Sequence, residues 1–281
     1  MKGRAIRASA LCLALSLTGC GAGGADSAAP ADRAQREPTG PFTVDTPVEA
    51  VLQDEVFGDY GRLLFPVDTG YWSGDTLGEL QLTWYNNIDP EETVEIVNTL
   101  WQRAEAGETV FYDIYTEEEK AQDPDKADTG LFFFKGEAGA PFAVCNAGGG
   151  FAYVGAMQDS FPHALELSKR GYNAFALIYR PGAFGEEDLP RPAAVVLQYT
   201  GHAEYTPEDP PTFACVGESD WIANWRTMER RLQALQDLGI PTEFHHYPGL
   251  PHGFGLGTGT VAEGWLDEAV AFWEAQRAPQ S

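Results

Sequence analysis

Short apolar runs alternate with amphipathic stretches along most of the chain, a pattern that predicts strands followed by helices. Strands are expected over residues 109–115, 130–135, 141–145, 173–179, 193–199, 211–216 and 242–247. Helices are expected over residues 90–106, 159–170, 222–238 and 261–276. Most of these strands are almost continuously apolar, so we predict an α/β fold with a mostly parallel, doubly wound sheet that has helices on both faces.

The stretch before the first long strand is less regular. Residues 43–87 are rich in aromatic side chains and turn residues, and the helix at 90–106 follows, with Asp89 as its expected cap and Pro90 in its first turn. Residues 43–108 are therefore interpreted as an N-terminal elaboration of a domain that spans 43–281. It either caps a substrate cleft or forms an extra layer on the sheet. Residues 117–128 are expected to form a charged loop.

Composition narrows the class of partners. The chain has 281 residues, 43% of them apolar, which is enough for one sizeable domain with a core. Its formal net charge is −24, so its surface repels phosphate backbones and anionic lipid. We therefore expect no nucleic-acid partner, and the sequence leaves the oligomeric state open.

The N-terminus has the pattern of an export signal. Residues 1–19 begin with basic side chains and continue in an apolar run, 8–17, that is too short to span a bilayer. The ending Leu-Thr-Gly-Cys20 resembles the lipobox of bacterial lipoproteins, which implies lipidation of Cys20 and an exported protein held in the cell envelope by its lipid anchor. An ordinary secretory signal that is cut nearby is the alternative. Residues 20–42 are expected to form a flexible tether.

Two cysteines and a histidine pair lie inside the predicted domain. Cys145 and Cys215 fall in apolar strands, so each is expected to be a buried structural thiol, and a disulfide would require their strands to lie close together. His245 and His246 are adjacent in a strand and should point to opposite faces, which suits packing better than metal binding. We predict no metal site and no cofactor.

Residues 141–155 contain a candidate functional loop. An apolar strand there ends in Gly148, Gly149 and Gly150, and glycines let backbone N–H groups approach a ligand closely. Such N–H groups commonly stabilise an oxyanion. A plain glycine-rich turn and a phosphate-binding loop are the alternatives.

Two side chains follow later strands at their carboxyl ends, where ligands gather in a doubly wound sheet. Asp220 follows the strand at 211–216, and His252 follows the strand at 242–247. Taken singly, Asp220 could cap a helix and His252 could be a turn residue. An acid and then a histidine, in this order after a glycine loop, match the last two members of a catalytic triad.

From residue 43 onward the chain therefore resembles an α/β-hydrolase of the esterase and lipase superfamily, best over 130–179 and 193–276. The glycines resemble the H-G-G-G oxyanion loop of that family, with Asn146-Ala147 in place of the usual preceding residues. The resemblance implies Gly149 and Gly150 as oxyanion donors, Asp220 as the triad acid and His252 as the general base. It also implies a small carboxylic ester as substrate.

The resemblance fails at the nucleophile. These enzymes carry a serine in a G-x-S-x-G turn, and none of the eight serines of the sequence lies in one. The connector at 180–192 is also too short for the strand–helix unit that should carry it, since a βαβ unit needs roughly 30 residues. We hypothesise an in-frame loss near 182–192 of the central strand and its flanking helices, which would leave unpaired strand edges and uncovered apolar faces. The nucleophile is therefore unassigned.

Two functions of different classes remain. The chain is either a cell-surface serine esterase by descent, with doubtful activity, or a non-catalytic binding lipoprotein that keeps the cleft of a hydrolase. A nucleotide-binding Rossmann protein is disfavoured, because three consecutive glycines do not match the G-x-G-x-x-G spacing of a pyrophosphate-binding turn.

Overall fold

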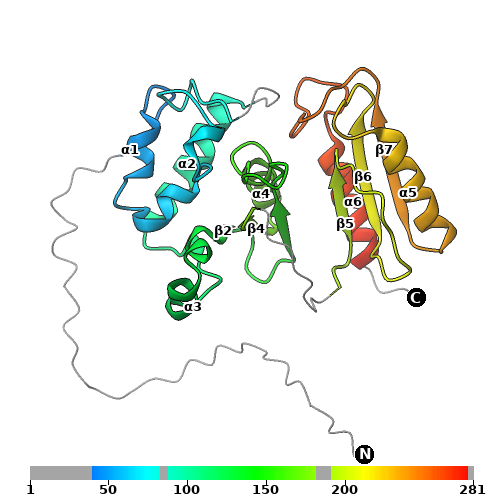
Figure 1. Cartoon of the computed structure of the whole chain (residues 1–281), viewed down its shortest axis with the longest axis horizontal. Helices are drawn as coiled ribbons and strands as arrows, with labels where there is room; N and C mark the ends of the chain where they lie inside the picture. Colours follow the sequence, from blue (N-terminus) through cyan, green and yellow to red (C-terminus); the bar gives the residue numbers. More distant parts are fainter. Residues whose placement is uncertain (1–39, 83–87, 182–190, 278–281) are drawn as a thin grey trace, which may run out of the picture. The chain divides into compact units, whose positions relative to one another are not determined.

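A computed structural model of the chain describes residues 40–82, 88–181 and 191–277 (Figure 1). The expected signal at 1–19, the anchor Cys20, nearly all of the tether and residues 182–190 of the expected join lie outside the described residues. Among the residues that are described, no helix is both long and apolar enough to cross a membrane.

The first of two sheets has four strands in the order β1-β2-β4-β3. They are β1 (Phe111–Tyr112), β2 (Gly130–Phe134), β3 (Phe142–Asn146) and β4 (Asn173–Ile178). β2 is antiparallel to both β1 and β4, whereas β3 and β4 are parallel. The expected strand at 109–115 is reduced to two residues, because only Phe111 and Tyr112 pair with β2.

The second sheet has three parallel strands in the order β5-β6-β7. They are β5 (Val195–Gln198), β6 (Thr212–Gly217) and β7 (Thr242–Tyr247). The fold is thus α/β, and three of the five strand pairs in the described parts of the chain are parallel. The predicted single sheet is present as two, since β3 and β5 each end their own sheet.

The long helices fall where periodicity predicts them. They are α2 (Pro90–Glu105), α4 (Ser160–Lys169), α5 (Trp225–Asp237) and α6 (Trp265–Arg277). The Asp89 side chain caps α2 by accepting the N–H groups of Glu91 and Glu92, as expected.

The expected charged loop at 117–128 is wrong. It forms a helix, α3 (Glu117–Gln122), followed by a 3-10 turn, Pro124–Asp128. A reciprocal capping box starts α3, because the Thr116 side chain accepts the Glu119 N–H while the Glu119 carboxylate accepts the Thr116 N–H.

The N-terminal elaboration forms an extra layer on the first sheet. Its short helix α1 (Val48–Leu52) contributes Val48 and Val51 to the same buried cluster as Phe132 of β2 and Phe161 of α4. Phe42 is also buried there, so the packed domain includes a residue that was assigned to the tether. Tyr71 of this layer stacks on Tyr153, with the ring centroids 4.7 Å apart.

One face of the first sheet is buried under α4, and the other face is more exposed. Side chains alternate across β2, so Phe132 and Phe134 are fully buried against the α4 side, whereas Phe133 points to the other face and is only half-buried. Phe142 and Val144 of β3 lie on that second face and are 63% and 48% exposed. We call this surface the open face, and its large apolar members are Tyr112, Leu131, Phe133, Phe142, Val144, Phe175 and Leu177.

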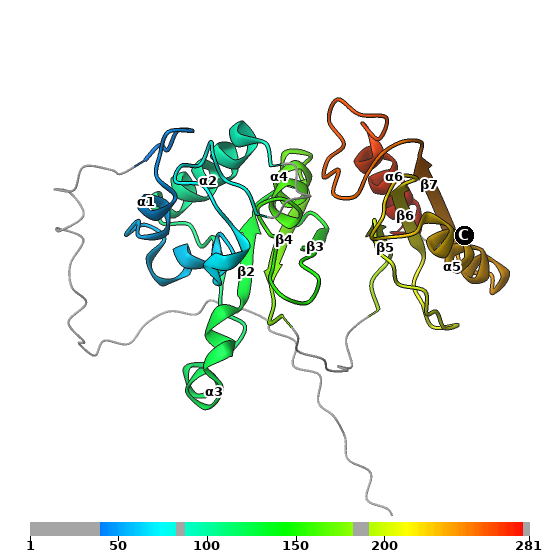
Figure 2. The same ribbon diagram turned by 45° about the horizontal axis from the view of Figure 1, so that its top comes forward.

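The second sheet is covered on both faces. His246 of β7 stacks on Trp225 of α5, with the ring centroids 4.6 Å apart, whereas its neighbour His245 lies 3.5 Å from Glu268 of α6. The prediction that the two histidines point to opposite faces is therefore confirmed. All six residues of β6, the middle strand, are buried, and Figure 2 shows α5 and α6 alongside this sheet.

Candidate functional site

Asp220 and His252 lie in direct contact. The Nδ1 atom of His252 is 2.8 Å from Oδ2 of Asp220, whose side chain is completely buried. The other carboxylate oxygen accepts the N–H groups of Ile222 and Ala223, at 2.8 and 2.7 Å. An ionised carboxylate can only accept, so Nδ1 is the protonated nitrogen of neutral His252 and Nε2 is its basic nitrogen.

The backbone explains why these two loops meet. Gly217 ends β6, and a Cβ atom there would lie 2.0 Å from the carbonyl oxygen of Leu250. Only glycine permits this approach between the loop that carries the acid and the loop that carries the histidine. The Ser219 N–H then donates to the same carbonyl at 3.1 Å. The order of the residues along the sequence predicted a pair, and the structure brings that pair together.

The glycine loop lies after β3, as expected. The N–H of Gly148 donates to Oδ2 of Asp159 at 3.0 Å. Gly149 has φ +150°, and a Cβ atom on it would lie 1.8 Å from the carbonyl oxygen of Tyr153. Within the described residues no hydrogen bond occupies the N–H groups of Gly149 and Gly150, the two donors that the resemblance implies.

Asp159 and Tyr199 join the two parts of the site, and neither was predicted as a functional residue. The Tyr199 hydroxyl donates to Oδ1 of Asp159 at 2.8 Å, and its ring lies 4.8 Å from that of His252. Asp159 directly precedes α4, but its side chain makes no cap hydrogen bond to that helix. No local signal could have identified this pair, because the partners are 40 residues apart in the chain.

The two thiols of the domain are poor candidates for a catalytic nucleophile. Both are free, so the open question of a Cys145–Cys215 disulfide is answered. Desolvation raises the pKa of Cys145 to about 12 and the pKa of the fully buried Cys215 well above its usual value. Only a thiolate attacks efficiently, and neither thiol forms one near neutral pH.

The described serines have other positions or roles. The Ser168 hydroxyl donates to the carbonyl oxygen of Leu165 within α4. The Ser160 hydroxyl is fully buried with no hydrogen-bond partner in the described structure, while Ser219 and Ser73 are exposed. Ser219 lies in the connection between β6 and α5, but none of these serines is in a G-x-S-x-G sequence.

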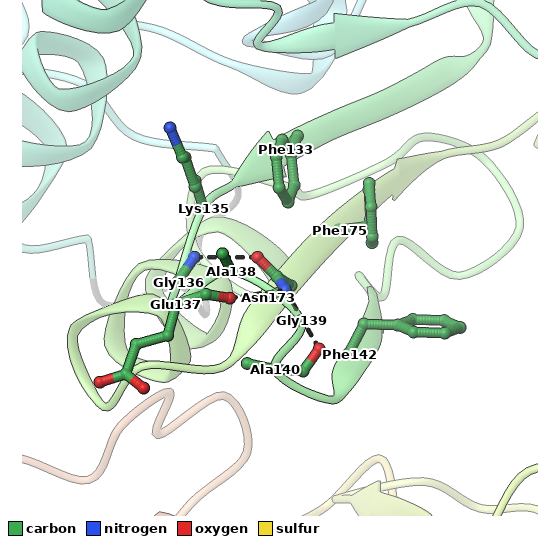
Figure 3. Close-up of a pocket in the computed structure, with 10 residues that line it drawn as sticks. All are labelled: Phe133, Lys135, Gly136, Glu137, Ala138, Gly139, Ala140, Phe142, Asn173 and Phe175. Carbon is green, nitrogen blue, oxygen red and sulfur yellow. Dashed lines mark hydrogen bonds between the residues drawn. The ribbon is translucent and has the colours of Figure 1, made fainter. Parts of the chain in front are cut away.

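Metal-binding groups do not gather in the described residues, where no three His, Cys, Asp or Glu side chains are arranged to hold an ion. A pocket of about 370 Å³ lies elsewhere, at the amino-terminal ends of β3 and β4 (Figure 3). Phe133, Phe142 and Phe175 line it, together with residues of the 136–140 turn. The glycine loop lies at the opposite, carboxyl end of β3, so this pocket is separate from the candidate site.

Comparison with known proteins gives similarities of fold. No family model and no curated protein matches the sequence. Among solved structures, the chain is similar to an acetyl ester-xyloside bifunctional hydrolase from Caldicellulosiruptor lactoaceticus, with 17% identity and a TM-score of 0.46 over 52% of this chain and 88% of that one. It is also similar to an α/β-hydrolase enzyme from a Medee basin deep-sea metagenome library, with 19% identity and a TM-score of 0.44 over 53% and 92%.

A third similar structure is Thermogutta terrifontis esterase 2, with 17% identity and a TM-score of 0.45 over 56% of this chain and 93% of that one. Of these three proteins, the deep-sea metagenome enzyme is described as an α/β-hydrolase. The present chain has, by its own topology, a mixed α/β architecture that contains parallel strands.

Proposed function

We propose that this chain carries the base, the acid and the oxyanion loop of a serine-type carboxylic-ester hydrolase, and that the segment with the nucleophile is missing. The contact between His252 and the buried, doubly hydrogen-bonded Asp220 is the observation that supports this most strongly. An orienting carboxylate behind an imidazole is the arrangement that activates a hydroxyl group.

The roles of the residues follow from this geometry. Asp220 fixes the tautomer and orientation of His252, and stabilises the imidazolium that forms when Nε2 takes a proton from a hydroxyl nucleophile. The N–H groups of Gly149 and Gly150 would then donate to the developing oxyanion. The oxyanion intermediate then collapses, the ester C–O bond breaks, and the imidazolium of His252 returns its proton to the departing alcohol. Deprotonated again, His252 activates a water molecule, which hydrolyses the acyl-enzyme, releases the carboxylic acid and restores the hydroxyl group. Every step except nucleophilic attack uses residues of this chain.

The two strand edges support the loss of a strand between β3 and β5. Both strands are terminal in their sheets, both have parallel neighbours, and neither has a charged residue that would protect an exposed edge. Val144 of β3 and Val196 of β5 are 48% and 43% exposed. One added parallel strand could hydrogen-bond to both edges, and a helix connected to it could cover the open face.

This part of the proposal has a test in sequence comparison. An intact relative should align with this chain on both sides of residues 182–190, with a single additional block of about 50 residues that carries the serine. Several scattered gaps in place of one block would contradict an in-frame loss.

Reaction with a fluorophosphonate probe tests the catalytic proposal directly. We expect no labelling of the folded protein, because the probe requires an activated nucleophile. Insertion of the block from an intact relative should produce labelling that His252→Ala abolishes. If the unmodified chain is labelled, and His252→Ala prevents this, the chain has its own nucleophile and the modified peptide identifies it.

The second candidate function is a non-catalytic binding protein that uses the same loops. The Gly149 and Gly150 N–H groups, which make no hydrogen bond within the described residues, and the imidazole that Asp220 orients would suit a ligand with a carboxylate or ester oxygen. Equilibrium binding of short-chain carboxylates to the unmodified chain, compared with His252→Ala, tests this function. Equal affinities would exclude binding at this site.

We further propose that the protein is an exported lipoprotein of the cell envelope, anchored through Cys20. The sequence ending at Cys20 is the support for this proposal. The expected result is that the wild-type protein partitions into detergent and that a Cys20→Ala variant does not. A variant that still partitions would contradict lipidation.

A further inference from the structure

We propose that Asp159 and Tyr199 are a positioning pair that fixes the glycine loop relative to His252. This inference rests on the proposed function of that loop and histidine. The pair is noteworthy because its members come from different sheets, Asp159 at the start of α4 on the first and Tyr199 directly after β5 of the second.

Asp159 closes the glycine loop from within. Its N–H donates to the carbonyl oxygen of Gly155 at 3.1 Å, and its Oδ2 accepts the N–H of Gly148 at 3.0 Å. Gly155 in turn donates to the carbonyl oxygen of Gly148 at 2.9 Å. These three bonds join the two ends of the 148–155 loop to each other and to Asp159, whose backbone holds the Gly155 end and whose side chain holds the Gly148 end. The position of that side chain therefore constrains the start of the loop.

Asp159 uses its remaining oxygen for Tyr199. Asp159 is only 7% exposed, and its carboxylate accepts hydrogen bonds from two neutral donors, the Gly148 N–H and the Tyr199 hydroxyl. A buried carboxylate needs its hydrogen bonds, because desolvation without them is costly. Loss of the Tyr199 hydroxyl would therefore change the position that Asp159 prefers, and the loop with it.

Tyr199 connects this carboxylate to the histidine. Its ring is tilted by 57° against that of His252, and Phe254 packs against it edge-on at 5.0 Å. Its N–H donates to the carbonyl oxygen of Cys215 in β6, at 2.8 Å. The side chain is therefore held at its backbone, at its ring and at its hydroxyl.

The backbone of Tyr199 is strained. Its φ is +38°, a region that residues other than glycine seldom adopt. Strain of this kind persists where surrounding contacts fix the residue, and it is concentrated at functional sites. Here it turns the side chain that directly follows β5 toward both Asp159 and His252.

Nuclear magnetic resonance of the full chain can test the pair without substrate. The two signals are the backbone amide of Gly148 and the imidazole ring of His252, the latter assigned among the five histidines with a His252→Gln variant. Tyr199→Phe removes only the hydroxyl. We expect it to speed amide exchange at Gly148 by roughly 10-fold, the loss of about 1.4 kcal/mol of protection, and to shift the His252 ring signals.

Tyr179→Phe is the matched control. The Tyr179 hydroxyl also donates to the glycine loop, to the carbonyl oxygen of Ala147 at 2.8 Å, but Tyr179 belongs to the strand end of β4. Loss of the Tyr179 hydroxyl should disturb the loop amides and leave the His252 ring signals in place.

Asp159→Asn should leave the Gly148 amide largely unchanged and shift the His252 ring signals. The asparagine keeps an oxygen that accepts the Gly148 N–H, but it presents an N–H donor to the Tyr199 hydroxyl in place of the acceptor.

The pair is excluded as a positioning device if Tyr199→Phe changes Gly148 exchange less than 2-fold, or if it moves the His252 signals no more than Tyr179→Phe does. If Tyr199→Phe does not fold, the His252 signals of Asp159→Asn decide the question. Failure of fluorophosphonate labelling in the chain with the restored block, together with these signal changes, would overturn the proposed function and leave the pair intact.

Discussion

The two sheets of this protein differ in how fully helices cover their faces. The second sheet has a fully buried middle strand with α5 and α6 on opposite faces, and it carries both Asp220 and His252 at its carboxyl end. The first sheet carries the glycine loop, and the helices within the described residues cover one of its two faces. Apolar strands thus form in both sheets, but among the described residues only the second sheet has a helical layer on each face.

Buried polar groups show the same contrast. The Oε1 of Gln158, the Oγ of Ser160 and the Nε2 of His163 are buried without a hydrogen-bond partner in the described structure, and all lie at the start of α4. In the second half only Nη1 of Arg231 is in that state among the described residues. Native proteins satisfy most such groups, directly or through internal water, so the start of α4 has fewer direct hydrogen bonds than the second half among the described residues.

The largest expected effect comes from substituting the two faces of the first sheet. Phe132→Ala removes a fully buried ring that packs against Phe111 and Phe161, and should lower the free energy of unfolding by about 3–5 kcal/mol. Phe142→Ala on the open face should change it by about 0.5 kcal/mol. Urea denaturation measures both. Equal losses would show that the open face is covered in solution.

Substitutions in the glycine loop should cause the next largest loss of stability. Gly149→Ala places a Cβ atom against the carbonyl oxygen of Tyr153, so the loop must move, at a cost on the order of 2–3 kcal/mol. Gly150→Ala is the control, because Gly150 has φ +59° and open space around it, and it should cost about 1 kcal/mol. Thermal unfolding of the two variants compares them. If Gly149→Ala lost less stability than Gly150→Ala, the close approach of Gly149 to the carbonyl oxygen of Tyr153 would be contradicted.

Periodicity alone predicted most of the long strands and helices, and chain order predicted that Asp220 and His252 would form a pair. Apolar runs fix the long strands and helices, whereas α3 was missed although its capping box, Thr116 to Glu119, is visible in the sequence. The contact of Asp220 with His252 followed from the rule that carboxyl ends of parallel strands lie at one edge. Tyr199 could not be predicted, because its role depends on a positive φ and a partner in the other sheet.

A smaller, pH-dependent effect is expected in the layer that covers the first sheet. Desolvation, followed by repulsion from Asp89 and Glu166, raises the pKa of Glu92 to about 7. Folding thus favours the protonated form, so ionised Glu92 destabilises the fold above pH 7, and this penalty disappears as the pH falls toward 4.5, where the unfolded chain also becomes protonated.

Glu92→Gln should therefore stabilise the protein at pH 8 by about 1 kcal/mol, a value reduced for solvent screening, and should have little effect near pH 4.5. Denaturant unfolding at both pH values measures the difference. The exposed neighbour Glu91, changed to Gln, is the control and should show no such pH dependence. A gain that is equal at both pH values would mean that the carboxylate of Glu92 is not the cause.

The exposed edge of β3 should affect association more than stability. Val144 is 48% exposed on a terminal strand without charges, a combination that favours pairing between copies of the chain. Val144→Lys places a charge at that edge, and should lower self-association in sedimentation velocity while changing the free energy of unfolding by about 0.5 kcal/mol or less. Val261→Lys is the matched control, since Val261 is 64% exposed but lies in the loop before α6. If both substitutions lower self-association equally, the added positive charge is the cause. If only Val144→Lys lowers it, the copies associate through the unpaired edge of β3.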